Sequence, residues 1–181
     1  MMFFRSLGDG AELRPLEPWQ AEEFFAHVER GREFIGQHIG FADAAKDLDG
    51  ARALLQRYAD KAATDTGRIY GIWLDDKLVG GVLFREMDVK QGRAEVGCWL
   101  EPAATGKGLI TRAARILIDW AIRERGMHRV EWLVSAANAP SIAVARRLGL
   151  TKDGVLRSYH EHRGVRQDLE VWSVLAPEWE S

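Results

Sequence analysis

Cysteine is almost absent from this sequence, since Cys98 is the only one among 181 residues. A single thiol excludes a disulfide within the chain and any zinc site built from a cluster of cysteines. No apolar run reaches the about 18–20 residues that a membrane-spanning helix needs. The segment MMFFRSLGDG at the start also lacks the about 7–15 apolar residues at the centre of a signal peptide. We therefore expect a cytoplasmic protein that does not bind membranes.

Neither sign of charge is in clear excess. The chain has 25 Lys and Arg against 27 Asp and Glu, a formal net charge of −2. Direct binding of nucleic acid usually needs a basic field, so this balance argues against a nucleic-acid partner. The composition, 46% hydrophobic and 29% charged, is that of an ordinary soluble globular protein. No repeat or Pro/Gly/Ser-rich linker divides the chain, and we expect one domain over residues 1–181.

Hydrophobic periodicity predicts the order of the helices and strands. The predicted strands are 12–16, 68–74, 78–87, 92–100, 129–135, 153–161 and 167–175, and the predicted helices begin at 18 or cover 47–63, 108–125 and 138–148. This order favours an α/β (α+β) architecture, in which a mixed central β-sheet of about 6–7 strands is flanked by helices on both faces. Propensity alone leaves Rossmann-like folds open.

The loop Ala103–Gly108 (AATGKG) connects a predicted strand to the start of a long amphipathic helix. Backbone N–H groups at a helix start lack intrahelical partners, and the helix dipole adds partial positive charge. Glycines let such groups approach an anion closely, so the loop is a candidate pyrophosphate site, although a tight turn alone also explains two glycines. The spacing matches neither a Walker loop, GxxxxGK[ST], nor the dinucleotide motif GxGxxG.

Four segments give a stronger indication together than any of them gives alone. They are Glu95–Leu100 (EVGCWL), Gly106–Thr111 (GKGLIT), Asn138–Ser141 (NAPS) and Arg147–Leu150 (RLGL). Their order and spacing resemble the GNAT acetyltransferases, and in particular the ribosomal-protein N-terminal serine/alanine acetyltransferases of the RimL/RimJ type. The loop itself fits the coenzyme A signature [Q/R]-x-x-G-x-[G/A], except that Ala103 stands where Gln or Arg is usual. The resemblance extends from Leu13 to Trp179.

The resemblance implies a GNAT fold and acetyl-CoA as the acetyl donor. The residues that would bind it are Trp99, Leu100, Ala103, Ala104, Thr105, Gly106, Lys107, Gly108, Thr111, Asn138 and Ser141. By the same resemblance, the loop N–H groups and the Thr111 hydroxyl hold the pyrophosphate, with added charge from Lys107 and Arg112. Backbone donors near Leu100 would stabilise the oxyanion that develops on the thioester.

Two residues are candidate catalysts. Glu95 is a charge in an apolar strand, which is costly unless it is paired or hydrated. By alternation it shares a strand face with Gly97 and Trp99, which is either simply solvated or faces the acceptor cleft. In the second case Glu95 accepts, through a water, the proton released by the attacking amine. Ser141 is expected near the thioester sulfur, where its hydroxyl can hydrogen-bond or protonate the leaving thiolate.

Several features have simpler interpretations. Asn138 before a Pro-started helix is an ordinary cap, and many GNAT enzymes use a tyrosine where this sequence has Ala145. A lone Cys98 in a strand is usually a small buried hydrophobe and not a nucleophile. His160 and His162 share a strand face, but without a third ligand we do not expect a metal.

The acceptor is expected to be a primary amine. Phe34, His38, Glu95, His160 and Asp168 are the candidate acceptor-binding residues. An α-amine, with a pKa of about 7.7–8.0, is far more often neutral at pH 7 than a lysine at about 10.4. This difference favours an α-amine as the acceptor. The resemblance implies the N-terminus of a ribosomal protein, whose amine attacks acetyl-CoA directly in a ternary complex. Polyamines, antibiotics and aminoacyl-nucleotides remain alternatives, as does a non-catalytic acyl-CoA-binding module; a homodimer is possible.

Overall fold

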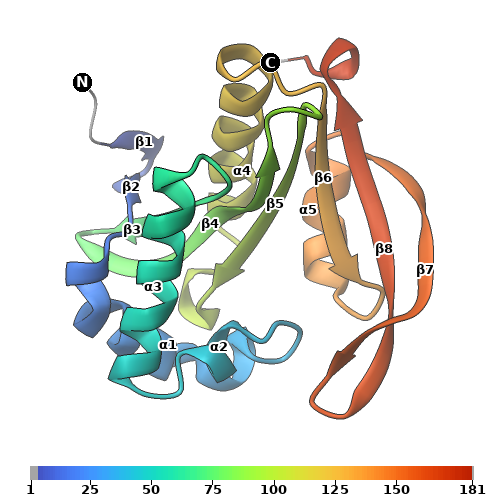
Figure 1. Ribbon diagram of the computed structural model, residues 1–181. Helices are drawn as coiled ribbons and strands as arrows, with labels where there is room; N and C mark the ends of the chain where they lie inside the picture. Colours follow the sequence, from blue (N-terminus) through green and yellow to red (C-terminus); the bar gives the residue numbers. More distant parts are fainter. Residues whose placement is uncertain (1–3, 181) are drawn as a thin grey trace.

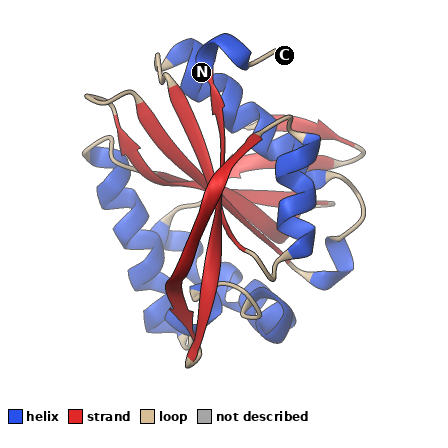
Figure 2. Cartoon of the chain, turned by 90° about the vertical axis from the view of Figure 1, so that its right-hand side faces the viewer, coloured by secondary structure: helices blue, strands red, loops and turns tan. Residues whose placement is uncertain are grey.

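The computed structural model describes residues 4–180 and contains one mixed eight-stranded sheet with helices on both faces (Figures 1 and 2). The strands are β1 (Arg5–Gly8), β2 (Ala11–Pro15), β3 (Arg68–Leu74), β4 (Lys77–Asp88), β5 (Arg93–Leu100), β6 (Arg129–Ser135), β7 (Thr151–His162) and β8 (Val165–Leu175). The α-helices are α1 (Ala21–Ile35), α2 (Phe41–Ala44), α3 (Leu48–Ala63), α4 (Leu109–Asp119) and α5 (Ala139–Arg147). The sheet order is β1-β2-β3-β4-β5-β6-β8-β7.

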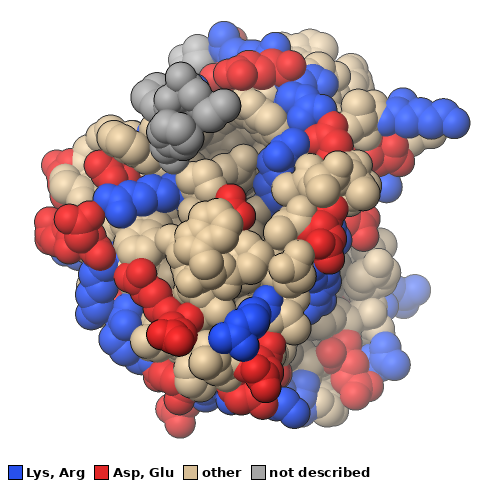
Figure 3. Space-filling view, turned by 60° about the vertical axis from the view of Figure 1, so that its left-hand side comes forward, with Lys and Arg blue, Asp and Glu red and all other residues tan. Residues whose placement is uncertain are grey.

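The predicted architecture is confirmed, with one strand more than the upper end of the predicted range. The additional strand is β1, in which only Leu7 is buried, so its short sequence shows no alternation that could reveal it. Within residues 4–180, no helix combines the length and apolarity needed to cross a membrane. On the face drawn in Figure 3, basic and acidic side chains are interspersed around a mostly uncharged central area.

Two hydrophobic cores cover the two faces of the sheet. One core packs α4 and α5 against the sheet and includes Ala94 and Val96 of β5. The other packs α1 and α3 and includes Trp99 of the same strand. Successive side chains of a strand point to opposite faces. Glu95 therefore belongs to the α1/α3 face, together with Trp99, as the alternation predicts.

The strands β5 and β6 separate partway along their length, and this separation positions the site. They form the parallel pair of the sheet, but they pair only where Arg93–Glu95 of β5 lie beside Arg129–Glu131 of β6. Beyond that point β5 continues to Leu100 beside β4, while β6 continues beside β8. The divergence is visible at the centre of Figure 1. The second half of β5 thus has an edge without a strand partner.

The helix after the glycine loop differs from the predicted continuous helix over 108–125. It is α-helical only to Asp119 and then forms a π-helical turn, Trp120–Glu124, before Gly126 ends it with a φ of +66°. Its buried face is wide and includes Ile110, Ala114 and Ile118. The reason is packing, because α4 contacts β1, β4, β5 and α5.

Candidate active site

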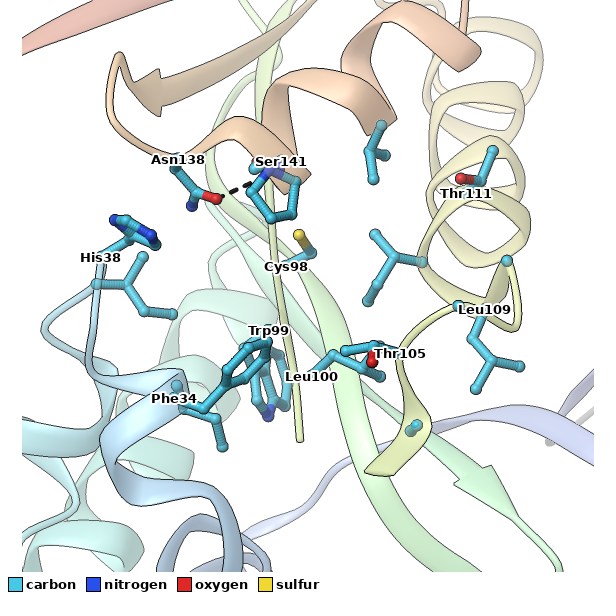
Figure 4. Close-up of a pocket in the computed structure, with 18 of the residues that line it drawn as sticks. Phe34, His38, Cys98, Trp99, Leu100, Thr105, Leu109, Thr111, Asn138 and Ser141 are labelled. Atoms are coloured by element: carbon cyan, nitrogen blue, oxygen red, sulfur yellow. Dashed lines mark hydrogen bonds between the residues drawn. The ribbon is translucent and has the colours of Figure 1, made fainter. Parts of the chain in front are cut away.

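A cavity of about 640 Å³ lies where β5 leaves β6, and it is lined from both faces of the sheet (Figure 4). One side is formed by residues between Cys98 and Arg147, which come from the end of β5, the glycine loop, α4 and α5. We call this side the donor wall. The other side is formed by residues 34–39, at the end of α1 and in the turn that follows it, which we call the acceptor wall. The cavity therefore passes through the level of the sheet at the point where the strands diverge.

The glycine loop presents open backbone at the start of α4. Gly106 and Gly108 have φ values of +77° and +69°, which favour glycine. A Cβ at either position would meet no atom within 4 Å, so both face open space. Gly108 is the N-cap of α4, and no side chain caps the helix there. The N–H groups at this helix start are available to an anion.

Two polar atoms beside the loop support the same interpretation. The Thr111 Oγ1 and Arg112 Nε atoms are buried and have no hydrogen-bond partner within the described part of the chain. Both residues line the cavity. The Arg112 guanidinium also contacts Asp9 at 2.9 Å and donates to the Lys107 carbonyl at 2.8 Å. A bound diphosphate would satisfy donors of this kind, so these residues fit the pyrophosphate of acetyl-CoA.

The predicted donor-binding residues are largely brought together. All of them line the cavity except Ala103 and Lys107. The Lys107 backbone instead orders Arg112, because its carbonyl accepts the guanidinium hydrogen bond. Arg147, at the end of α5 and in the RLGL segment, also lines the cavity, and no signal in the sequence predicted this position.

Ser141 is held at the N-terminus of α5. The Asn138 side chain accepts a hydrogen bond from the Ser141 backbone N–H at 3.2 Å, drawn as a dashed line in Figure 4. The predicted cap is therefore present, and both residues also line the cavity. The Ser141 side chain also has a partner: its Oγ atom accepts a hydrogen bond from the indole Nε1–H of Trp132 at 3.0 Å. Trp132 lies on β6 and was not identified from the sequence.

A buried hydrogen-bond chain fixes the end of β5. The Trp99 indole donates to His27 Nε2 at 3.0 Å, and His27 Nδ1 lies 3.0 Å from Glu101 Oε2. Because the indole can only donate, the Nδ1–H of a neutral His27 donates to Glu101. Burial lowers the pKa of His27 from 6.5 to about 4, although the Glu101 carboxylate opposes the shift. Arg30 also donates to Glu101, at 3.1 Å.

Glu95 lies outside the 640 Å³ cavity. Its carboxylate is 3.1 Å from the Arg85 guanidinium, and the side chain is 17% exposed. It lines a separate polar cavity of about 810 Å³ with Glu131 and Tyr159, among others, at the point where β5 and β6 begin to diverge. Burial raises the pKa of Glu95; Glu86 and Glu131 act in the same direction, and Arg85 opposes them. A raised pKa brings a carboxylate closer to the range of a useful general base.

The five predicted acceptor residues separate into two groups. Phe34 and His38 line the acceptor wall, and burial is the main cause that lowers the pKa of His38. His160 and Asp168, like Glu95, do not reach this cavity. Asp168 accepts the Ser158 N–H at 2.8 Å, which stabilises the irregular part of β7.

The tip of the β7–β8 hairpin contacts the acceptor wall. His160 stacks on His162, with ring centroids 6.0 Å apart. His162 is buried, and its Nε2 atom lies 2.7 Å from the Gly36 carbonyl oxygen. Arg163 donates to Asp43 at 2.8 and 3.2 Å. The hairpin therefore contributes to this side of the site by supporting it.

The sulfur of Cys98 points into the cavity in Figure 4. Burial raises the pKa of this thiol to about 12, so it stays protonated at neutral pH. The thiolate is the nucleophilic form, which argues against an acyl-cysteine intermediate. Among residues 4–180, no three His, Cys, Asp or Glu side chains are grouped as metal ligands would be.

Comparisons with known proteins identify related sequences. A family profile described as "Acetyltransferase (GNAT) domain" matches residues 11–151. "Putative ribosomal N-acetyltransferase YdaF" of Bacillus subtilis (strain 168) is 30% identical over 184 residues, covering 99% of this chain and 98% of that protein. "Probable N-acetyltransferase YjcK" of the same strain is 33% identical over 170 residues, covering 92% and 94%.

A solved structure extends the comparison to the fold. The ribosomal L7/L12 alpha-N-protein acetyltransferase RimL, in complex with coenzyme A, matches with a TM-score of 0.90 over 95% of this chain and 97% of that chain. The sequence identity is 18%, so this likeness concerns the fold.

The family match includes the strand, loop and helices that form the donor wall. The two relatives extend the similarity over nearly the whole chain. The free N–H groups of the glycine loop and the unpaired Thr111 hydroxyl agree with the donor that this family uses. The chain belongs to the GNAT acetyltransferase family and is an acetyl-CoA-dependent N-acetyltransferase.

Proposed function

We propose that this enzyme acetylates the N-terminal α-amine of a protein, as enzymes of the RimL/RimJ type do, and that the acceptor is a ribosomal protein beginning with serine or alanine. The observation that carries the proposal is the cavity that leads from the glycine loop to Ser141 along the free edge of β5. The name of YdaF, a relative over almost the whole chain, supports the ribosomal acceptor.

On the donor wall, acetyl-CoA supplies the acetyl group as a thioester. The N–H groups at the start of α4 and the Thr111 hydroxyl hold its diphosphate, with Arg112 adding positive charge. The thioester then lies along β5, where backbone N–H groups beyond Glu95 have no strand partner on the open edge. Such donors stabilise negative charge that develops on the carbonyl oxygen.

On the other side of the sheet, the neutral amine attacks the thioester carbonyl. The new C–N bond forms, the C–S bond breaks and the bonding electron pair leaves with sulfur. The amine loses its proton through water to Glu95, whose raised pKa suits a proton acceptor. Ser141, which lines the cavity, donates a hydrogen bond to the departing sulfur, and solvent supplies the proton of the free thiol.

An α-amine matches this site better than a lysine does. The difference between their pKa values, about 2.5 units, corresponds to about 3.5 kcal/mol for producing the neutral amine at pH 7. A single carboxylate that acts through water is a modest base, so it selects the acceptor that is already partly neutral. This argument favours protein N-termini over lysine side chains.

The acidic residues near α2 and α3 do not favour a cationic small molecule. Asp43 is paired with Arg163, Asp47 caps α3 by accepting the Gly50 N–H at 2.7 Å, and Asp49 lies 3.2 Å from Arg52. These carboxylates are occupied within the protein. Polyamines and aminoglycosides therefore serve as comparison acceptors in the test.

The test is a turnover screen with acetyl-CoA. Peptides that begin with serine, alanine or methionine are compared with N-terminally blocked copies that contain lysine, with spermidine and with an aminoglycoside. We expect coenzyme A release with Ser- and Ala-first peptides, and mass spectrometry should place the acetyl group on the α-amine. Faster turnover of blocked lysine peptides or of spermidine would contradict the proposed acceptor. Light scattering on the same sample checks the predicted homodimer.

A further inference from the structure

The side chain of Trp132 connects the sheet to the site. Its indole Nε1–H donates to Ser141 Oγ at 3.0 Å, from the centre of β6 to the first turn of α5. We propose that Trp132 is a positioning residue for acetyl transfer, which turns the Ser141 hydroxyl so that its hydrogen points at the leaving sulfur. This inference rests on the role proposed above for Ser141.

The direction of the hydrogen bond determines where the serine proton can go. An indole N–H can only donate, so Ser141 Oγ must be the acceptor. The Ser141 backbone N–H is already bonded to Asn138. Within residues 4–180, Trp132 is the only hydrogen-bond partner of this hydroxyl oxygen. The hydroxyl hydrogen is therefore left for an acceptor in the cavity that Ser141 lines.

Trp132 is well placed to hold this orientation. It is 2% exposed and ranks among the largest buried side chains of the protein. On β6 it lies opposite Trp172 of β8 in the strand register, within the core that α4 and α5 cover. A large side chain packed in this way cannot change rotamer without a cavity or a clash. The oxygen it contacts is thereby fixed relative to the strand that diverges from β5.

The same bond strengthens the donor. A hydroxyl that accepts a hydrogen bond becomes a better donor, because hydrogen bonds in a chain polarise one another. As the C–S bond breaks, the electron pair moves to sulfur and the negative charge there grows. The Ser141 O–H then donates to a stronger acceptor than in the ground state. Only an interaction that strengthens towards the transition state raises kcat.

The experiment is a double-mutant cycle on Trp132→Phe and Ser141→Ala, measured as kcat and as KM for acetyl-CoA. A hydrogen bond of this kind predicts a loss of kcat of about five- to tenfold in each single variant. Because Trp132 acts through Ser141, the double variant should fall no further than Ser141→Ala alone, within about twofold. KM for acetyl-CoA should change far less than kcat in all three variants, because the Ser141 hydrogen bond strengthens only as the sulfur leaves.

Trp172→Phe is the matched control. Trp172 is buried beside Trp132 in the sheet register, but its indole donates to Glu170, outside the cavity. Because both indoles are buried, each Trp variant should have a lower melting temperature than the wild type. Only Trp132→Phe should also lower kcat. If the two variants lose kcat equally, or if the effects of Trp132→Phe and Ser141→Ala multiply, the inference is overturned.

A second measurement does not require Trp132→Phe to fold. In ¹⁵N-labelled protein each of the seven tryptophans gives one indole N–H signal. Ser141→Ala removes the acceptor of Trp132, so one of these signals should shift clearly more than the others. If no indole signal moves, the hydrogen bond is absent and the inference fails. If Ser141→Ala keeps full kcat, the proposed role of Ser141 fails, whereas absence of any acetyl-CoA turnover would contradict the proposed function itself.

Discussion

The donor wall and the acceptor wall face each other across one cavity but are held by different kinds of contact. The donor wall comes from two stretches of chain, 98–112 and 138–147, and each depends on local geometry, such as the left-handed Gly108 and the Asn138 cap. The acceptor wall is held by side chains from the β7–β8 hairpin. His162 meets Gly36 across 126 residues of sequence.

This difference in contacts separates donor recognition from acceptor choice. A site built largely from backbone N–H groups depends less on the identity of nearby side chains than one built from side chains alone. A wall that depends on a few long-range side-chain contacts can change its shape by substitution without disturbing the donor. We infer that donor recognition and acceptor choice can be altered independently, and four predictions test this separation.

The largest effect is expected at the hydrogen-bond chain between the donor wall and α1, the helix that leads into the acceptor wall, where Trp99 donates to His27. Burial holds the pKa of His27 at about 4, below its ordinary value of 6.5. The stability that the neutral ring contributes is thus fully present above pH 6.5 and is lost as the pH falls towards 4. A shift of this size corresponds to about 3 kcal/mol.

Urea unfolding between pH 7.5 and pH 4.5 measures this loss. Carboxylates also titrate in this range, so His27→Gln provides the reference, because its amide cannot take up a proton there. We expect a steeper fall in the free energy of unfolding for the wild type than for His27→Gln. Parallel curves would show that burial does not hold His27 neutral in the folded protein.

The second effect concerns catalysis on the acceptor side. Glu95→Gln should lower kcat by about a hundredfold, since a general base typically contributes at least that much. Acetyl-CoA affinity should be retained, because Glu95 does not line the donor cavity. In the wild type, kcat/KM should rise with pH through a limb above the ordinary glutamate range, because burial raises the pKa of Glu95.

Glu131→Gln sharpens this prediction. Glu131 is the register partner of Glu95 and adds to the rise of its pKa. Removing its charge should keep the plateau of kcat/KM and move the acid limb to lower pH. If Glu131→Gln loses as much kcat as Glu95→Gln does, the assignment of Glu95 as the base is wrong.

The third effect tests the backbone character of the donor wall. Gly108→Ala places a Cβ at a φ of +69°, in the open space of the loop. Gly126→Ala places one at +66°, also in open space but away from the cavity. Both should lose about 1 kcal/mol of stability from left-handed strain. Calorimetry should show weaker acetyl-CoA binding for Gly108→Ala alone, and equal binding in both would refute the loop as the diphosphate site.

Most of the donor wall could be predicted from the sequence, because its signals are local. Gly106 and Gly108 and the Asn138 cap follow from residues a few positions apart, and the structure contains each of them. The order of the elements was also predictable. The π-helical turn after Asp119 was not, since it depends on packing against the sheet.

The misses share one cause, which is that the packing of elements decides these contacts and no local pattern of residues reveals them. Trp132 gives no local sign that its indole reaches Ser141, and Glu101 gives none that it is buried against His27 and Arg30. Such contacts are decided by which elements pack together. Asp168 was expected beside the acceptor because of its place in the last hairpin. It instead accepts the Ser158 N–H and stabilises the bulge of β7.

The smallest effect concerns the ion pair between Arg163 at the hairpin tip and Asp43 of α2. Both side chains are about half exposed, and exposed pairs contribute little to stability, so Arg163→Ala should melt close to the wild type. Its expected consequence is a few-fold rise in KM for the peptide acceptor, with KM for acetyl-CoA unchanged, because the pair holds the acceptor wall only. Arg166→Ala is the control, since Arg166 pairs with Glu161 inside the hairpin at 3.6 Å. If Arg163→Ala raises KM for acetyl-CoA as well, the two walls are coupled and their independence is refuted.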